Sequence, residues 1–225
     1  MKSNRKTKKS STQPSAGRTI RRAVRLVRNA LTPTENAIDL LKSQHVEVKS
    51  LFKRIEKASA HAQKTKLFDE LASKLVGHDA IEREIFYPAC EKAMGMTDLL
   101  GEALVEHGVV EFSLYQADQA RQSKDFSFKC QVLSEIVEHH VKEEEEDFFP
   151  KVEKALGKDE LEELCSRMKA RFEETQAKGD FRTPLQGNLK QVLAGVLKPA
   201  KRSPGARGSK KPALPARANK RRKAA

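Results

Sequence analysis

Residues 77–88 read GHDAIEREIFYP and residues 139–150 read HHVKEEEEDFFP. In both stretches one His is followed by Glu four and six positions later, by Phe eight positions later and by Pro ten positions later. The two stretches are 62 residues apart, and the same offset separates His45 from His107. The chain therefore contains one helical hairpin twice, with a His on the first helix of each copy and a His-x-x-x-Glu pair on the second.

This spacing predicts a metal site. Residues four apart lie on one face of a helix, with about 5–6 Å between their Cβ atoms. His78 and Glu82 can therefore bind one cation together, or the Glu can bridge two, and His140 with Glu144 repeats the arrangement. Imidazole and carboxylate without thiolate suit iron or manganese better than a soft metal. A lone His on an apolar stripe is usually a core residue, but four that obey one repeat offset indicate ligands.

The rest of the sequence predicts an all-α fold. Ala, Leu, Glu and Lys dominate the composition, which favours helix over sheet. Short connections between long helices predict an antiparallel up-down four-helix bundle. We expect its helices at residues 34–59, 63–93, 98–122 and 128–156.

A fifth, shorter helix is expected at 158–177, where four apolar residues recur at helical spacing: Leu161, Leu164, Met168 and Phe172. Its apolar stripe is either a cover for the bundle or a dimer surface, so the oligomeric state stays open. Pro88 and Pro150 are interpreted as kinks or helix ends beyond the site. The bundle domain is placed at 32–177, with Pro33 near the first helical position.

These segments resemble the family of hemerythrin HHE cation-binding domains. The resemblance rests on residues 44–45, 77–88, 106–107 and 139–146 and covers roughly residues 35–155, about half of the chain. It implies an antiparallel bundle around a non-haem, carboxylate-bridged di-iron centre, with Glu82 and Glu144 as the bridging carboxylates. The ligands that it implies are His45, His78, Glu82, His107, His140 and Glu144.

Two positions depart from the oxygen-carrying members of that family. Those proteins have a second His four residues after the third one, where this chain has Glu111, which we include as a seventh candidate ligand. Their last carboxylate is an Asp five residues past its His, whereas Glu144 is four past His140 and five past His139. The sequence leaves both histidines open as the ligand. The pattern resembles the sensing and iron-handling members more than the oxygen carriers.

Two functions are consistent with such a centre. A binding module would bind iron, O₂, NO or peroxide reversibly and report or buffer it. A di-iron enzyme with peroxide-disproportionating or ferroxidase-like activity is the alternative. The sequence offers no separate general acid, general base or substrate pocket, so the binding or sensing function is favoured.

Charge is distributed unevenly along the chain. Residues 1–30 carry ten Lys or Arg and residues 181–225 carry thirteen, with no acidic residue in either segment. The part between them has 21 basic and 31 acidic residues, a charge of −10. We expect a basic N-terminal arm at 1–31 and a basic disordered tail at 178–225.

The arms also predict partners and location. Basic segments attract nucleic acid through salt-sensitive, sequence-independent contacts; alternatively, they solubilise the protein or fold back on its acidic body. Residues 18–31 have the pattern of a basic amphipathic helix, which would pack on the bundle, contact nucleic acid or membrane, or act as a mitochondrial transit peptide. Three cysteines without CxxC spacing, and no apolar run near the ~18 residues of a membrane span, predict a cytoplasmic protein, with nucleoid association as an extension.

Overall fold

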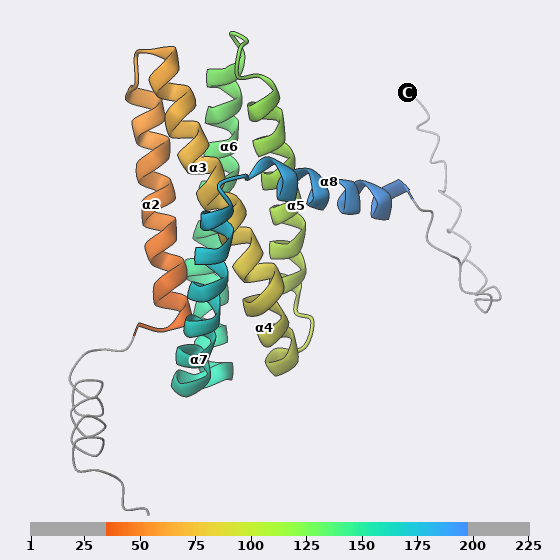
Figure 1. The fold of residues 1–225 in the computed structure, drawn as a ribbon. Coiled ribbons are helices and arrows are strands. Elements are labelled where there is room, and N and C mark those ends of the chain that lie inside the picture. Colours follow the sequence, from red (N-terminus) through yellow and green to blue (C-terminus); the bar gives the residue numbers. More distant parts are fainter. Residues whose placement is uncertain (1–34, 198–225) are drawn as a thin grey trace, which may run out of the picture.

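Four antiparallel helical rods form the body of the protein (Figure 1). The computed structural model describes residues 35–197, and the side chains of residues 35–191. The first and third rods are the single helices α2 (Ala37–Lys57) and α5 (Asp98–Gln119). The second rod is α3 (His61–Ile81), a π-helical turn η1 (Glu82–Phe86) and α4 (Tyr87–Met94). The fourth is α6 (Phe126–Glu143), a second π-helical turn η2 (Glu144–Phe148) and the start of α7 (Phe149–Lys178). The predicted all-α up-down bundle is confirmed, and the described residues contain no strand.

Asn36 sets the start of the bundle. Its Oδ1 atom accepts hydrogen bonds from the N–H groups of Ile38 (2.8 Å) and Asp39 (3.1 Å), and Asp39 Oδ2 accepts one from the N–H of Asn36 at 3.2 Å. This reciprocal capping box satisfies donors that the first helical turn leaves free. The first helix therefore begins at Ala37 and not at residue 34 as predicted, and Pro33 lies outside the described residues.

Both prolines of the repeat follow a π-helical turn. The N–H of Tyr87 bonds to the carbonyl of Glu82, and the N–H of Phe149 bonds to that of Glu144, which closes the two wide turns. The next residue is Pro in each case, and in an ordinary α-helix its ring clashes with the carbonyl four residues earlier. A wider turn relieves this clash, so each helix continues beyond its Pro instead of ending there. The two widened turns begin at the glutamates predicted as ligands, and such turns are frequent at functional sites.

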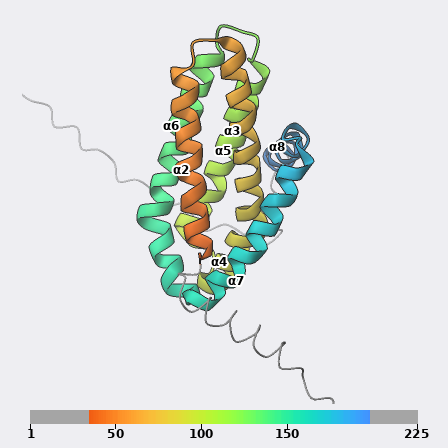
Figure 2. The ribbon, with the colours of Figure 1, turned by 60° about the vertical axis from the view of Figure 1, so that its left-hand side comes forward.

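Helix α7 changes direction at Gly157. This residue has φ 73° and ψ 174°, a conformation that Gly adopts at no steric cost. Residues 158–178 then pack along α2 and α3 (Figures 1 and 2). Leu161, Leu164 and Met168 are buried there in this chain's own core. The predicted fifth helix is therefore a cover for the bundle.

The close approach of α7 to α3 requires Gly77. A Cβ atom at this position would lie 2.7 Å from Gln176 Nε2, 2.8 Å from Phe172 Cε2 and 2.8 Å from Thr175 Oγ1. Real Cβ atoms do not approach other heavy atoms so closely. The absence of a side chain thus lets α7 pack directly against the turn of α3 that carries His78.

Helix α8 (Arg182–Leu197) lies where the sequence predicts only a disordered tail. It packs across α5 (Figure 1), with Phe181, Leu185 and Leu189 buried in the core. Arg182 donates two hydrogen bonds to Asp118, at 3.0 and 2.9 Å. Residues 182–197 thus differ from the predicted disordered tail, because an apolar residue at every fourth position can bury one helix face even in a basic, acid-free segment. Residues 1–34 and 198–225, on which the other predictions for the arms fall, lie outside the described residues.

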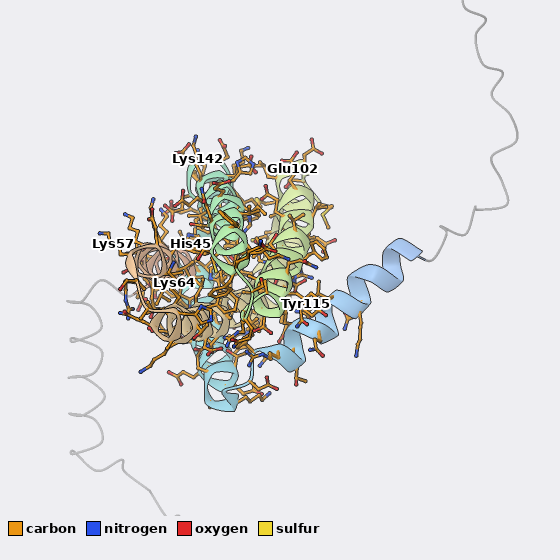
Figure 3. All side chains as sticks on the ribbon, turned by 90° about the horizontal axis from the view of Figure 1, so that it is seen from above. His45, Lys57, Lys64, Glu102, Tyr115 and Lys142 are labelled. Atoms are coloured by element: carbon orange, nitrogen blue, oxygen red, sulfur yellow. The ribbon has the colours of Figure 1, made fainter. Side chains whose placement is uncertain are left out.

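The core has two apolar clusters with a polar layer between them. One cluster lies toward the α2–α3 connection and includes Phe68 and Phe126, and the other includes Phe86. The polar layer consists of nine buried side chains, which are Gln44, His45, His78, Asp79, Glu82, His107, Glu111, His140 and Glu144. Seen from above, His45 points into the bundle whereas Lys142 lies on its outside (Figure 3).

Two further expectations concern the described part of the chain. None of its helices is long and apolar enough to cross a membrane. Cys90, Cys130 and Cys165 are free and buried. Burial raises the pKa of the Cys90 and Cys130 thiols to about 12, so neither offers a thiolate near neutral pH.

Candidate metal centre

Four histidines and two glutamates meet in the polar layer. His45, His78, Glu82 and Glu144, the first subsite, each place one ligand-type atom within 4.8 Å of the others. The second subsite, Glu82, His107, His140 and Glu144, does the same. Each helical rod contributes one histidine, and the two glutamates belong to both subsites. The structure thus brings together six of the seven residues that the sequence predicts as ligands.

Each glutamate faces one histidine of either subsite. Glu82 Oε2 lies 3.1 Å from His78 Nε2 and 3.2 Å from His107 Nε2. Glu144 Oε2 repeats this placement, at 3.4 Å and 3.5 Å from the Nε2 atoms of the other two histidines. A cation in either subsite would therefore meet both carboxylates.

Despite these short approaches, several buried atoms of the layer have no hydrogen-bond partner. They are Glu82 Oε1 and Oε2, Glu144 Oε2 and His140 Nε2. The relative exposures of Glu82 and Glu144 are 0% and 1%. Burying a carboxylate oxygen without a partner is unfavourable, and cations between these groups would supply partners for all four atoms. The residues present therefore fit a metal with a preference for imidazole and carboxylate.

The outward-facing nitrogen of each histidine has an acceptor behind it. Such bonds orient the imidazole ring and direct the lone pair of Nε2 toward a metal. Two of the acceptors directly precede the first histidine of each hairpin, so the repeat includes them as well. The Nδ1 donors and their acceptors are His45 and Glu145 (2.8 Å), His78 and Gln44 (2.8 Å), His107 and Asp79 (2.6 Å), and His140 and Glu106 (2.8 Å).

Neighbouring carboxylates raise the pKa of two histidines of the layer, His45 and His107. Burial acts to lower the pKa of His45, but the neighbouring carboxylates of Glu144 and Glu145 outweigh burial and raise the pKa to about 9. Burial opposes charge on His107 too, yet the neighbouring carboxylates of Asp79 and Glu82 raise its pKa to about 10. Burial alone would raise the pKa of Glu82, whereas its histidine neighbours hold that pKa well below the ordinary value. Metal binding at these Nε2 atoms would displace protons.

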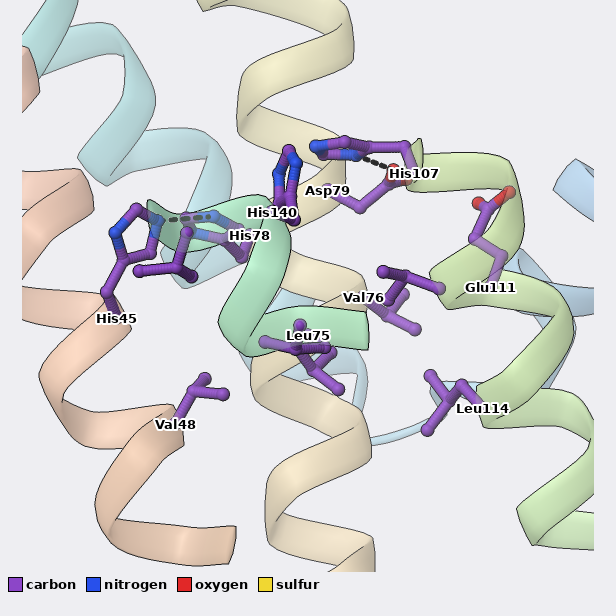
Figure 4. Close-up of a pocket in the computed structure, with 13 residues that line it drawn as sticks. His45, Val48, Leu75, Val76, His78, Asp79, His107, Glu111, Leu114 and His140 are labelled. Carbon is purple, nitrogen blue, oxygen red and sulfur yellow. Dashed lines mark hydrogen bonds and ion pairs between the residues drawn. The ribbon is translucent and has the colours of Figure 1, made fainter. Parts of the chain in front are cut away.

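A small apolar cavity adjoins the histidines (Figure 4). Its volume is about 40 Å³, which exceeds the roughly 10–15 Å³ that one water molecule needs. Apolar side chains from all four rods form most of its wall, including Val48, Leu75, Leu114 and Val137. The cavity can therefore admit a molecule of a few atoms next to the metal ligands.

From the sequence, Tyr87 is expected to have a packing role in preference to a role at the metal. Its Oη atom donates a hydrogen bond to Glu144 Oε1 at 2.8 Å and lies 2.8 Å from His107 Nε2. Burial and the nearby carboxylates hold the pKa of this phenol well above the ordinary value, so it remains a proton donor. The repeat itself contains a signal, since Tyr87 occupies the position that Phe149 has in the second copy.

Glu111, the seventh predicted ligand, belongs to neither subsite. It is buried, but its Oε2 atom accepts a hydrogen bond from Arg83 Nη2 at 3.1 Å and its Oε1 atom accepts one from Asn188 Nδ2 at 2.6 Å. Burial, followed by the charge of Asp79, raises its pKa to about 7. In this structure the carboxylate of Glu111 therefore faces Arg83 and Asn188 on α8 and lies in neither group of metal ligands.

The two adjacent histidines His139 and His140 have different environments. His140 is buried and directs Nε2 toward Glu144, whereas the side chain of His139 is 65% exposed. His139 lies near Glu106 and Glu143 at the surface. Only His140 is therefore placed to serve the second subsite.

A buried layer of histidines and glutamates inside an antiparallel bundle defines a metal-binding helical-bundle protein. The sequence matches the model of the hemerythrin HHE cation binding domain over residues 36–152. The chain belongs to this family.

Three relatives illustrate the match. An uncharacterized protein of Mycobacterium tuberculosis (strain H37Rv) is 29% identical over 141 residues, which cover 62% of this chain and 86% of that protein. The crystal structure of a hemerythrin HHE cation binding domain-containing protein from Mycobacterium kansasii is 31% identical, with a TM-score of 0.58 and coverage of 67% of this chain and 96% of that one. A DNA nickase of Nostoc is 24% identical over 136 residues, 60% of this chain and 38% of that protein.

Proposed function

We propose that this protein is a non-haem di-iron protein that binds or senses iron, O₂, NO or peroxide. The observation that carries the proposal is that two buried groups of His and Glu share Glu82 and Glu144. Two subsites with common carboxylates suit a pair of cations, since each carboxylate neutralises charge on both sides. Membership of a cation-binding family supports this proposal.

Iron is the metal that we propose for both subsites. Imidazole and carboxylate ligands suit it, and it supplies redox change and affinity for small ligands when bound. The chain's own residues orient the imidazole rings through their Nδ1 bonds and hold a protonated phenol, Tyr87, beside Glu144. The adjoining cavity has mostly apolar walls, and its small volume limits the ligand to a few atoms. O₂, NO and peroxide meet this limit.

The alternative is a di-iron enzyme with peroxide-disproportionating or ferroxidase-like activity. The sequence favours binding or sensing, but two observations in the structure support the enzyme. Tyr87 is a buried proton donor at the second subsite, and Glu111, whose pKa is near neutrality, lines the cavity. Steady turnover of hydrogen peroxide without loss of iron would select the enzyme, and stoichiometric binding without turnover would select the sensor.

The test is anaerobic loading of the purified protein with Fe(II), removal of excess iron, metal analysis and absorption spectra before and after exposure to air. We expect one iron for each of the two subsites. His140→Ala should lose iron and the air-induced near-ultraviolet bands. His139→Ala is the matched control, since this adjacent side chain is exposed, and it should load as the wild type does. Equal loading of the two variants would contradict the proposed site.

For the basic arms we propose a second function, non-specific binding of nucleic acid at the cytoplasmic nucleoid. Residues 198–225 contain eleven Lys or Arg and no acid, a composition that attracts phosphates and releases counterions. One relative is named a DNA nickase, although this chain matches only 38% of it.

Deleting residues 198–225 tests this function. The deletion should abolish salt-sensitive retardation of duplex DNA while the iron content stays that of the full chain, because the metal ligands lie in the bundle. Retardation that survives the deletion would contradict the role of this segment.

A further inference from the structure

Asn188 on α8 connects the C-terminal part of the chain to the second subsite. Its Nδ2 atom donates to Glu111 Oε1 at 2.6 Å and to Asp79 Oδ2 at 3.2 Å, which uses both hydrogens of the amide. Asp79 Oδ1 in turn accepts from His107 Nδ1 at 2.6 Å. A side chain of α8 thus contacts the carboxylate that orients a histidine of the second subsite.

Arg83 completes this cluster. Its Nε atom donates to Asp79 Oδ1 at 2.6 Å and its Nη2 atom donates to Glu111 Oε2 at 3.1 Å. Two neighbouring buried carboxylates repel each other, so both need donors to remain in place. Loss of the Asn188 amide would remove the donor from Asp79 Oδ2 and from Glu111 Oε1.

The first subsite has no counterpart of this cluster. The repeat offset of 62 residues relates Asp79 to Val141 and Glu111 to Lys49, neither of which is a carboxylate. No described side chain of α8 bonds to Gln44 or Glu145, the Nδ1 acceptors of the first subsite. Helix α8 packs instead on α5, which carries His107. The contacts of α8 therefore reach the second subsite, through Asp79 and His107.

We infer that Asn188 is a positioning residue of the second subsite, and that docking of α8 is coupled to cation binding there. The inference rests on the proposed metal function. A cation on His107 Nε2 would require the imidazole to stay in its present orientation, and an Asp79 held by Asn188 keeps the imidazole in that orientation through Nδ1. Coupling of this kind is reciprocal, so an undocked α8 weakens cation binding as much as an absent cation weakens docking.

This coupling reaches beyond the family match, which ends at residue 152. Helix α8 leads directly to residue 198, where the basic segment of the chain begins. Cation binding at the second subsite therefore strengthens the packing on α5 of α8, the helix that directly precedes this basic segment.

Iron release separates the two subsites. Full-length protein loaded anaerobically with Fe(II) is mixed with an excess of a chromogenic Fe(II) chelator, and release is followed in time. In Asn188→Ala, one iron should leave faster than in the wild type by up to about 10-fold, the lower end of the range for loss of a direct partner of a ligand, because Asn188 acts through Asp79. The other iron should keep its wild-type rate. Gln191→Ala is the matched control, because this exposed residue lies on the same helix and on the same groove without bonding to the cluster.

Hydrogen exchange of the α8 amides provides a readout that does not depend on iron release. Exchange should slow on Fe(II) loading in the wild type and in Gln191→Ala, and not in Asn188→Ala. The variant should still fold, because Phe181, Leu185 and Leu189 and the Arg182–Asp118 pair also hold α8. Asn188→Asp, which replaces the donor by a third carboxylate, should accelerate release at least as much as Asn188→Ala.

The outcomes distinguish the two proposals. A wild-type protein that retains no iron would overturn both the proposed metal function and the coupling. A wild-type protein that retains two irons, with release from Asn188→Ala and exchange of α8 both unchanged, would overturn the coupling alone.

Discussion

His45 and His107 are basic side chains enclosed by carboxylates. Their pKa values are raised to about 9 and to about 10, against 6.5 for a free imidazole. Since folding raises these values, both histidines stabilise the folded ion-free protein fully below about pH 6.5, and this contribution is lost as the pH rises through 9 and 10. The same protons compete with a metal.

We therefore expect the melting temperature of the ion-free protein to fall between about pH 7 and about pH 10, because deprotonation removes this stabilisation. The fall should be smaller in His107→Gln, which lacks one of the two groups. Thermal unfolding in a chelator, followed by circular dichroism at several pH values, measures it. His139→Ala should follow the wild type, and a fall of the same size in His107→Gln would contradict the assignment.

The inner site residues could be predicted from the sequence because a repeat offset is visible without a structure. Tyr87 and Glu111 could not be assigned in this way, since their roles depend on rotamers and on distant partners. The contact between Asp79 and Asn188 spans 109 residues, and no periodicity links two such positions. Glu111 was the natural candidate by its place one turn after His107, yet a donor from α8 turns it away.

Among the helices, α3 carries the tightest packing constraint. The turn that holds His78 lies against α7, and the contact leaves no room for a side chain at Gly77. Gly101, also helical, has no heavy atom within 4 Å of where its Cβ would lie. The two glycines thus form a matched pair with opposite environments.

Gly77→Ala should destabilise the protein by about 1–3 kcal/mol, the usual effect of overpacking a close contact. Gly101→Ala should stabilise it by up to about 1 kcal/mol, since Ala is the better helix former and meets no neighbour. Urea unfolding of both variants measures the difference in free energy. Equal effects of the two substitutions would mean that α7 does not pack against α3 as closely as described.

The helical rods were predictable because their apolar residues recur at helical spacing over many turns. The π-helical turns were not, although Pro88 and Pro150 indicated that something interrupts the regular helix. Helix α8 was missed because its basic composition resembles that of a disordered tail, while its stability comes from tertiary contacts of Leu185 and Leu189. The composition of this segment predicts disorder, whereas the burial of its apolar face stabilises a helix.

On the scale of the whole molecule, the core is stratified. Two apolar clusters enclose a layer that contains four histidines and several buried carboxylates. A buried polar atom without a partner costs about 1–3 kcal/mol, and Glu82 alone has two such atoms. In the ion-free protein, burial of the two apolar clusters therefore offsets the unfavourable free energy of the polar layer. A bound cation would remove much of that unfavourable contribution.

Metal binding should consequently raise the melting temperature of the entire bundle, because the ligands come together only in the folded state. At a free metal concentration about 1,000 times the dissociation constant the gain is about 4 kcal/mol, or roughly 8–16 °C for a domain of this size. The measurement is thermal unfolding in a chelator and with anaerobic Fe(II). His140→Ala should lose the part of the gain that a cation in the second subsite supplies, because His140 belongs to that subsite alone, whereas the exposed His139→Ala should keep the full gain. A gain that is undiminished in His140→Ala would mean that no cation in the second subsite stabilises the bundle.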